Sequence, residues 1–284
     1  MRILGWLALA GLLTGVILGA AGYRSARSEP IVRTTTISVP EWPHGAPPLR
    51  IALLSDIHMG GAAMDVRRLD RIVDAVNARS PDLVLIAGDF VYGHSPEEGR
   101  AATAHLTAPL SRLKAPLGVV AVLGNHDHWT DPDAVQEALE SAGVTVLKNT
   151  AAVRGPAVIL GIDDAFSGND QIGLTMKSAE MLAGFRIALT HAPDLAFSLP
   201  TDVTLVLGGH SHCGQLVLPL IGPVIERSPL LNKPLYDPRY RCGVVDGDGQ
   251  TVIVTGGLGA SGPPMRIGAP PDWWFITLVP RKPG

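Results

Sequence analysis

The sequence predicts an α/β fold in which helices cover both faces of a sheet. Two observations support this prediction. Over residues 49–147, short apolar strands alternate with segments whose apolar side chains recur at helical spacing. Such alternation is typical of parallel strands that are joined by helices. In addition, 46% of the 284 residues are hydrophobic and 17% are charged, so the chain can bury the core of one large domain.

The expected elements follow one another in a regular order. Residues 65–79 show the helical pattern well, with Leu69, Ile72 and Val76 on one face. Further helices are expected over residues 97–113 and 133–142. The expected strands cover residues 31–39, 50–55, 83–87, 118–123, 144–147, 157–162, 185–190, 204–207, 215–218, 251–255 and 274–279.

The N-terminal segment predicts a membrane anchor. Residues 3–22 contain no charge and no proline, and about 20 helical residues span the roughly 30 Å of a bilayer core. We therefore expect a transmembrane helix within residues 1–24. A cleaved signal peptide is an alternative, since Gly19-Ala20-Ala21 resembles a small-residue cleavage site. A buried soluble helix is a second alternative, although it would usually show a polar face.

Two further regions follow this anchor. Residues 25–48 are expected to be a juxtamembrane linker with a possible strand, and residues 49–284 form the main domain. Basic residues flank the apolar run, with one before it and three after it: Arg2, Arg24, Arg27 and Arg33. Their distribution favours a cytoplasmic main domain, with the extracytoplasmic face as the alternative.

Charge and cysteine content exclude some classes of protein. The net charge is −3 and no basic block occurs, so we expect no dedicated nucleic-acid partner. Two cysteines, Cys213 and Cys242, are too few for a disulfide framework. They are either free thiols or one bridge.

Side chains typical of metal ligands follow several of the expected strands. In open α/β sheets, binding sites form beyond the carboxyl ends of the strands, so these side chains are expected at one edge. Oxygen and imidazole ligands without a thiolate suit a pair of divalent or trivalent transition metals such as Mn, Fe or Zn. Such a pair of metals stabilises both the attacking and the leaving oxygen of a phosphoryl transfer. The candidate ligands are Asp56, His58, Asp89, Asn125, His191, His210 and His212.

Two neighbouring residues are candidates for catalysis. His126 is not among the expected metal ligands, and its place beside Asn125 lets it face a bound phosphate. We interpret it as a general acid or a charge stabiliser at the leaving oxygen, with Asp127 orienting its ring. The alternative is a histidine that merely occupies the start of a helix.

The order of these segments resembles the calcineurin-like metallophosphoesterases. Their pattern D-x-H, G-D, G-N-H-[DE], H and G-H-x-H matches DIH, GDF, GNHD, THAPD and GHSH here. The resemblance covers residues 49–279. The segments GGHSHCGQ, Arg239-Tyr240, GGLGASGPPMR and WWFITL are more similar to a membrane-anchored branch that includes UDP-diacylglucosamine pyrophosphatases. Cys213 departs from that branch, where a glycine is usual.

The resemblance implies a fold and a ligand set. The fold is a four-layer α/β/β/α sandwich of two mixed sheets flanked by helices. One metal is held by Asp56, His58, Asp89 and His212. The other is held by Asp89, Asn125, His191 and His210, so that Asp89 bridges the pair.

The expected function is that of a membrane-anchored dinuclear-metal hydrolase. It would cleave a phosphoester or pyrophosphate bond by metal-activated hydroxide, with a lipid-linked substrate preferred. The alternatives are a tethered phosphodiesterase or phosphatase for soluble substrates, and a non-catalytic metal-binding scaffold. The sequence predicts no oligomeric state.

Overall fold

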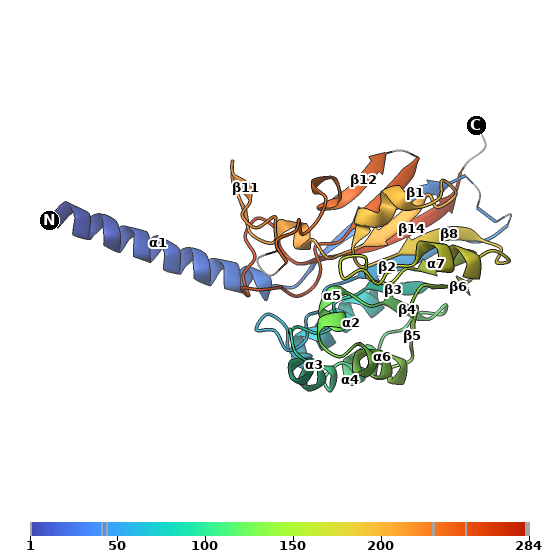
Figure 1. The fold of residues 1–284 in the computed structure, drawn as a ribbon, viewed down its shortest axis with the longest axis horizontal. Coiled ribbons are helices and arrows are strands. Elements are labelled where there is room, and N and C mark those ends of the chain that lie inside the picture. The colour runs from blue at the N-terminus through green and yellow to red at the C-terminus, as the bar shows by residue number, and fades with distance from the viewer. Residues whose placement is uncertain (1, 41, 44, 229–230, 248, 282–284) are drawn as a thin grey trace.

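The computed structural model describes residues 2–40, 42–43, 45–228, 231–247 and 249–281. A long helix, α1 (Arg2–Ala26), leads into a body of two six-stranded sheets and the helices around them. Figure 1 shows α1 projecting from one end of this body. The expected α/β fold with two mixed sheets is confirmed.

The first sheet has the strand order β1-β14-β2-β3-β4-β5. β2, β3, β4 and β5 are parallel, and β14 runs antiparallel to β2. The sheet is therefore mixed, and the parallel part is the alternating region expected from the sequence. Its strands are β1 (Ile31–Val39), β2 (Leu49–Leu54), β3 (Leu83–Ala87), β4 (Val119–Val122), β5 (Val144–Val146) and β14 (Asp272–Pro280).

β1 is an integral strand of this sheet. It pairs in parallel with β14 along its whole length, from Ile31 opposite Asp272 to Val39 opposite Pro280. Residues 31–39, expected only as a possible strand within a linker, therefore belong to the main body. A parallel partner leaves no local sequence signal when it lies at the far end of the chain.

The second sheet has the order β12-β13-β9-β8-β7-β6. Its four central strands are parallel and both edge strands are antiparallel. The edge strands β6 and β12 are only partly buried, so their sequences lack the continuous apolar pattern of the others. The strands are β6 (Thr150–Arg154), β7 (Ala157–Gly161), β8 (Phe185–Leu189), β9 (Leu205–Gly208), β12 (Gly243–Gly247) and β13 (Gln250–Val254).

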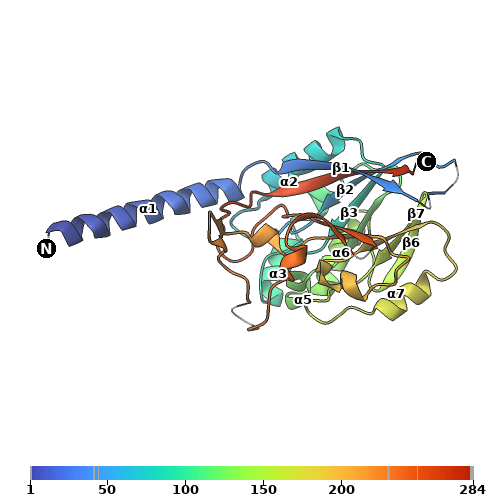
Figure 2. The same ribbon diagram turned by 90° about the horizontal axis from the view of Figure 1, so that it is seen from above.

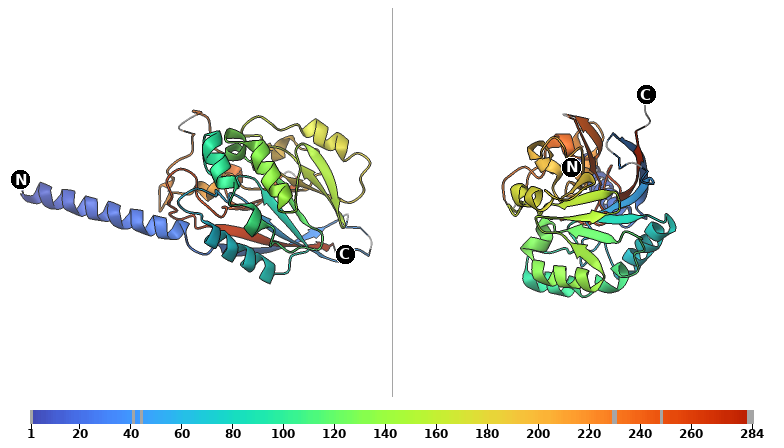
Figure 3. Two further views of the ribbon diagram at one scale, coloured as in Figure 1. Left: turned by 90° about the horizontal axis from the view of Figure 1, so that it is seen from below. Right: turned by 90° about the vertical axis from the view of Figure 1, so that its right-hand side faces the viewer.

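The two sheets pack face to face, with helices outside (Figures 2 and 3). Leu53 and Leu85 from the first sheet meet Leu189 and Leu207 from the second in one buried cluster. The first sheet is covered on its outer face by α2 (Val66–Ala78), α3 (Pro96–Thr103), α4 (Thr107–Leu110) and α6 (Pro132–Ser141). The second is covered by α7 (Ile172–Ser178) and the 3₁₀ helix η1 (Pro193–Ser198).

The helix expected over residues 97–113 is divided into α3 and α4. Pro109 lies within α4, and a proline cannot donate the backbone hydrogen bond that a continuous helix would require there. The chain therefore turns between the two short helices.

α1 carries exposed apolar side chains along much of its length, among them Trp6, Leu12 and Ile17. Among the described residues, however, no helix combines the length and apolarity needed to cross a membrane. The transmembrane span expected for residues 3–22 is not confirmed.

Candidate metal centre

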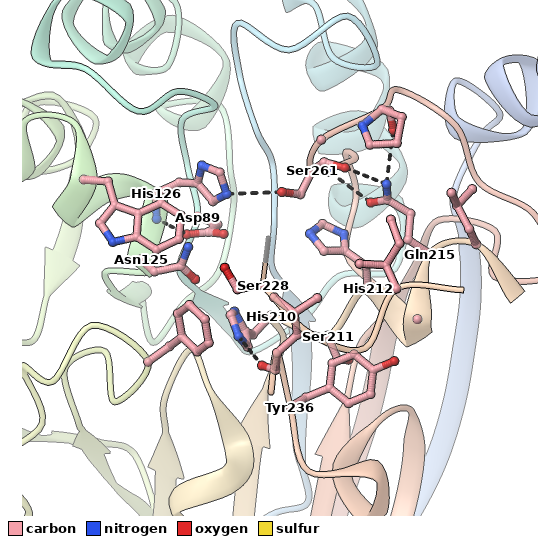
Figure 4. Close-up of a pocket in the computed structure, with 18 of the residues that line it drawn as sticks. Asp89, Asn125, His126, His210, Ser211, His212, Gln215, Ser228, Tyr236 and Ser261 are labelled. Carbon is pink, nitrogen blue, oxygen red and sulfur yellow. Dashed lines mark hydrogen bonds between the residues drawn. The ribbon is translucent and has the colours of Figure 1, made fainter. Parts of the chain in front are cut away.

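The seven candidate ligands converge at the ends of strands from both sheets. Asp56 and Asp89 follow β2 and β3, whereas His191 and His210 follow β8 and β9. Asn125 opens the short helix α5 (Asn125–Trp129) after β4. All seven side chains are buried, and Figure 4 shows Asp89, Asn125, His210 and His212 around one cavity.

The first group of donors contains Asp56, His58 and His212. The Nε2 atoms of the two imidazoles lie 3.1 Å apart, and Asp56 Oδ1 lies 3.4 Å from Nε2 of His212. These donor atoms all lie within 4.8 Å of one another. Asp56 Oδ1 is buried without a hydrogen-bond partner among the described residues. A buried carboxylate oxygen is costly unless something satisfies it, and a cation among these donors would do so.

The second group contains Asn125, His191 and His210. Nε2 of His191 lies 3.2 Å from Asn125 Oδ1 and 3.1 Å from Nδ1 of His210. Asp89 lies between the two groups, because its Oδ2 is 3.5 Å from Nε2 of His58 and 3.3 Å from Nε2 of His191. Its position agrees with the bridging role that the family resemblance implies.

Two of the imidazoles are held by hydrogen bonds from the ring nitrogen that points away from the donor cluster. His191 donates from Nδ1 to the carbonyl of Ala87 over 2.7 Å, and His210 donates from Nε2 to the carbonyl of Leu235 over 2.8 Å. His210 therefore keeps a lone pair on Nδ1, the nitrogen that faces the donor cluster, whereas His191 turns Nε2 towards the oxygens of Asn125 and Asp89. Such bonds are the usual support of metal-binding histidines.

His212 is held differently, by a buried arginine. Arg266 donates from its guanidinium to Nδ1 of His212 over 2.9 Å and also donates to the carbonyls of Gly256 and Gly259. Arginine has no acceptor, so Nδ1 is the acceptor and the proton of the neutral ring lies on Nε2. A metal at Nε2 would have to displace that proton.

The backbone at the cluster is unusual. Positive φ angles near 50–70° are uncommon for residues other than glycine and cluster at functional sites. Gly124 is required beside them, because a Cβ there would lie 2.3 Å from the Asp89 carboxylate. The candidate ligands with such angles are Asp56 (51°), His58 (51°), Asp89 (56°), His210 (69°) and His212 (48°).

Burial determines the electrostatics of the cluster. It raises the pKa of Asp56 to about 7, and the nearby Asp89 adds to this shift. Burial lowers the pKa of His58 and of His210 to about 3. Those two imidazoles are thus kept neutral, as metal ligation requires. His191 differs, because the neighbouring Asp89 carboxylate outweighs burial and raises the pKa of this imidazole well above its usual value; a metal at its Nε2 would have to displace a proton. The donor set fits a pair of transition-metal cations.

His126 lies beside the first group, with its ring centroid 4.9 Å from that of His58. Its Nδ1 donates to the carbonyl of Gly93 over 3.0 Å, and its Nε2 lies 3.2 Å from Oγ of Ser261. Figure 4 shows this second bond at the wall of the cavity. Burial lowers the pKa of His126, so Nε2 accepts the Ser261 hydroxyl proton.

The expectation that Asp127 orients this ring is wrong. Both ring nitrogens are bonded to other groups, and the Asp127 carboxylate accepts backbone N–H groups instead. Its donors are Asp89, Phe90, Val91 and Gly124. The carboxylate lies in the first turn of α5 and is turned towards the loop after β3, so it fixes the backbone that carries Asp89.

Sequence reasoning missed Ser261, which is hydrogen-bonded to His126, and Arg266, which is hydrogen-bonded to His212. Both come from the loop between β13 and β14, which has neither helical nor strand periodicity. The glycine-rich start of this loop lies near the site, because Gly259 donates its N–H to the carbonyl of Asp56 over 2.7 Å. In the sequence, the only indication of these two contacts was that a serine and an arginine follow closely after these glycines.

The two cysteines form a disulfide between Cys213 and Cys242. Cys213 directly follows His212 within the 3₁₀ turn η2 (His212–Gly214). Ser211 also donates to the carbonyl of Arg241 over 2.6 Å. The loop that carries His210 and His212 is therefore tied to the segment before β12.

A cavity of about 310 Å³ opens in front of the donor cluster. Asp89, Asn125, His210 and His212 face it on one side. Apolar side chains line much of the rest, including Trp129, Phe166, Leu216, Ile225 and Pro263. The cavity wall is therefore polar at the donor cluster and largely apolar elsewhere.

Comparison with known proteins identifies the class. The family model for calcineurin-like phosphoesterases matches residues 49–214, more than half of the chain, and the chain belongs to this family. It is a metal-dependent phosphoesterase.

Among individual relatives, the chain is 32% identical to an uncharacterized metallophosphoesterase, YkuE, of Bacillus subtilis, over 94% of this chain and 93% of that one. It is also 32% identical to a transmembrane protein with metallophosphoesterase domain from Danio rerio, over 94% of this chain but only 61% of that relative. Among solved structures, TT1561 of Thermus thermophilus aligns with 75% of this chain and 91% of its own, at 14% identity and a TM-score of 0.45. These comparisons do not confirm the UDP-diacylglucosamine pyrophosphatase branch.

Proposed function

We propose that this protein is a membrane-associated dinuclear-metal phosphohydrolase that cleaves a phosphoester or pyrophosphate bond in a lipid-linked substrate. The position of Asp89 is the observation that supports a site with two metals. Its Oδ2 lies within 3.5 Å of imidazole nitrogens from both donor groups. A carboxylate there would hold two cations close together and offset their repulsion. The assignment of ligands to the two sites is the one given above from the family resemblance.

The cations supply the chemistry of water activation. When bound, they would lower the pKa of a coordinated water and offset the charge that develops on the phosphoryl group. The residues of the chain hold the donors in place: Ala87 and Leu235 fix the rings of His191 and His210, and Arg266 fixes His212.

His126 is proposed to act at the leaving oxygen. Its Nε2 faces the cavity through the Ser261 hydroxyl. An anionic phosphate in the cavity would raise the low pKa of this imidazole, so that Nε2 acquires a proton and donates it to the departing oxygen. Ser261 then positions the ring before the substrate arrives.

The lipid-linked substrate is supported by two apolar features. The cavity wall carries Trp129, Phe166 and Leu216, and α1 exposes apolar side chains beyond the body. The relatives from Danio rerio and Bos taurus are both named transmembrane proteins. We propose that α1 holds the enzyme at a membrane.

The test is hydrolysis by the full-length protein in detergent. The protein is stripped with a chelator, reloaded with Mn²⁺ and assayed with bis(4-nitrophenyl) phosphate. Hydrolysis should require the metal. It should be lost in His58→Ala but kept in His105→Ala, a control on an exposed histidine. Equal rates for stripped and reloaded protein, or for the two variants, would contradict the proposal.

A second assay addresses the substrate class. CDP-diacylglycerol in mixed micelles is compared with soluble CDP-glycerol, which has the same pyrophosphate without acyl chains. A lipid-directed enzyme should show the higher kcat/KM with the acylated compound. A preference for the soluble compound would favour the tethered phosphodiesterase instead.

A further inference from the structure

A short hairpin carries two of the most exposed apolar side chains among the described residues of the main body. It consists of β10 (Val217–Leu218) and β11 (Gly222–Pro223), which pair in antiparallel fashion. Leu220 at its tip is fully exposed and Ile221 is 74% exposed. The sequence has no charged residue from Cys213 to Ile225. Loops that face water are ordinarily polar, so this hairpin requires another explanation.

The hairpin is held firmly in place at its base. Val217 donates its N–H to the carbonyl of Ile267 over 2.8 Å, and Ile267 donates to the carbonyl of Gln215 over 2.9 Å. Within the hairpin, Val224 donates to the carbonyl of Leu216 over 2.8 Å. The apolar tip is therefore presented outward by a bonded base.

The segment at the base of the hairpin also contacts the C-terminal end of α1. Arg266 donates its backbone N–H to the carbonyl of Gly22 over 2.9 Å. The helix and the loop also pack closely, since a Cβ at Gly22 would lie 3.1 Å from Cβ of Met265. Residues 265–267 thus connect the C-terminal end of α1 with the hairpin. Figures 1 and 2 show both features at the same end of the body.

The base of the hairpin also forms part of the cavity wall. Leu216 precedes β10 and Ile225 follows β11, and both line the cavity in front of the metal centre. The candidate active site, the hairpin and α1 are therefore arranged on one side of the molecule.

We propose that the tip of the β10–β11 hairpin inserts into the interface of a lipid bilayer, as a second membrane contact beside α1. This inference rests on the membrane association in the proposed function and adds a site to it. The contact would hold the cavity against the membrane surface, so that a lipid headgroup enters without leaving the bilayer.

Size and charge favour a bilayer over a protein partner. A stable protein interface covers about 800 Å² on each partner, and a tip with two prominent side chains offers far less. A few aliphatic side chains inserted into the headgroup region are sufficient for an interfacial contact. Arg24 near the end of α1 and Arg227 after β11 are exposed, where they can contact anionic headgroups.

A fluorescent probe in the full-length protein tests the contact. Leu220→Cys is labelled with NBD under non-reducing conditions, so that the Cys213–Cys242 disulfide stays closed, and the protein is reconstituted into phosphatidylcholine–phosphatidylglycerol vesicles. Met181→Cys is the matched control, because Met181 is 91% exposed and follows α7. The probe at 220 should shift to the blue and be quenched by doxyl-labelled lipid, whereas the probe at 181 should be quenched by aqueous iodide.

Two results would overturn the inference. One is equal quenching of both probes by iodide. The other is a blue shift at 220 that doxyl lipid does not affect and that grows with protein concentration, because it would indicate a contact with a second copy. The probe measurement uses no substrate, so failure of the proposed hydrolytic function would leave its result intact.

The paired variant Leu220→Asp and Ile221→Asp supplies a functional readout. It should match the wild type on bis(4-nitrophenyl) phosphate, because neither residue lines the cavity. It should lose activity severalfold on vesicle-borne CDP-diacylglycerol, whereas Met181→Asp should not. Equal activity of both variants on the vesicles would contradict a role of the hairpin in presenting substrate.

Discussion

The guanidinium of Arg266 donates to Nδ1 of His212 over 2.9 Å, while Nε2 of the same ring faces His58. Arg266 is almost completely buried. It therefore supports a candidate metal ligand from a loop that contributes no ligand itself.

Arg266→Lys should weaken metal binding. Lysine keeps a positive charge but lacks the planar set of donors that reaches both His212 and the carbonyls of Gly256 and Gly259. Loss of a group that supports a ligand typically costs about 10–100-fold in metal affinity. Competition with a chromogenic chelator measures this change.

Arg68→Lys is the matched control for that variant. Arg68 is equally buried but donates to the carbonyls of Ser28 and Leu258, away from His212. It should lower stability without lowering metal affinity. The same loss of affinity in both variants would mean that Arg266 has only a structural role.

His126→Ala should keep both metals and lower kcat. The loss expected for a general acid is about 10²–10⁴-fold, and it should be smaller for substrates with good leaving groups, which need less protonation. A series of aryl phosphodiesters of decreasing leaving-group pKa measures this dependence. A uniform loss across the series would assign His126 to charge stabilisation alone.

Asp194 should make stability depend on pH. Burial raises its pKa from 3.8 to about 6, against the opposing effect of a hydrogen bond from the Asp237 backbone. That bond joins the Asp237 N–H to Oδ2 over 2.9 Å, and Oδ1 has no hydrogen-bond partner among the described residues. A raised folded-state pKa favours the protonated carboxyl, so this contribution to stability is present below about pH 4 and lost as the pH rises through about 6.

Asp194→Asn removes this titration. Compared with the wild type, the variant should gain up to about 3 kcal/mol of unfolding free energy between pH 4 and pH 7.5. Urea denaturation at both pH values measures the difference, and Asp133→Asn on an exposed turn of α6 is the control. If wild type and variant differ in unfolding free energy by the same amount at both pH values, the Asp194 carboxyl titrates normally and the prediction is wrong.

The sequence was most informative where strands end in chemistry-bearing residues. Asp56, Asp89 and His191 follow continuous buried strands, so their convergence follows from the geometry of the sheets. The parallel pairing of β1 with β14 could not be read locally, because the two strands lie at opposite ends of the chain. Ser261 and Arg266 were missed because an irregular loop has no periodicity that reports where its side chains lie.

Asp127 illustrates a different limit. Its place beside His126 suggested a pair, but adjacent residues in the first turn of a helix point in different directions. The carboxylate is turned towards the backbone after β3, and the carbonyl of Gly93 and the hydroxyl of Ser261 hold the imidazole. Sequence adjacency predicted the residues of this region but not their hydrogen bonds.

The central claim is that Asp89 joins two metal sites, and Asp89→Asn tests it most directly. An amide cannot supply the bridging charge, so the variant should retain clearly fewer than two metal equivalents and lose hydrolysis. Metal content by mass spectrometry, with bis(4-nitrophenyl) phosphate turnover on the same sample and Asp133→Asn as the control, gives the answer. Two retained equivalents with normal turnover in Asp89→Asn would contradict the account.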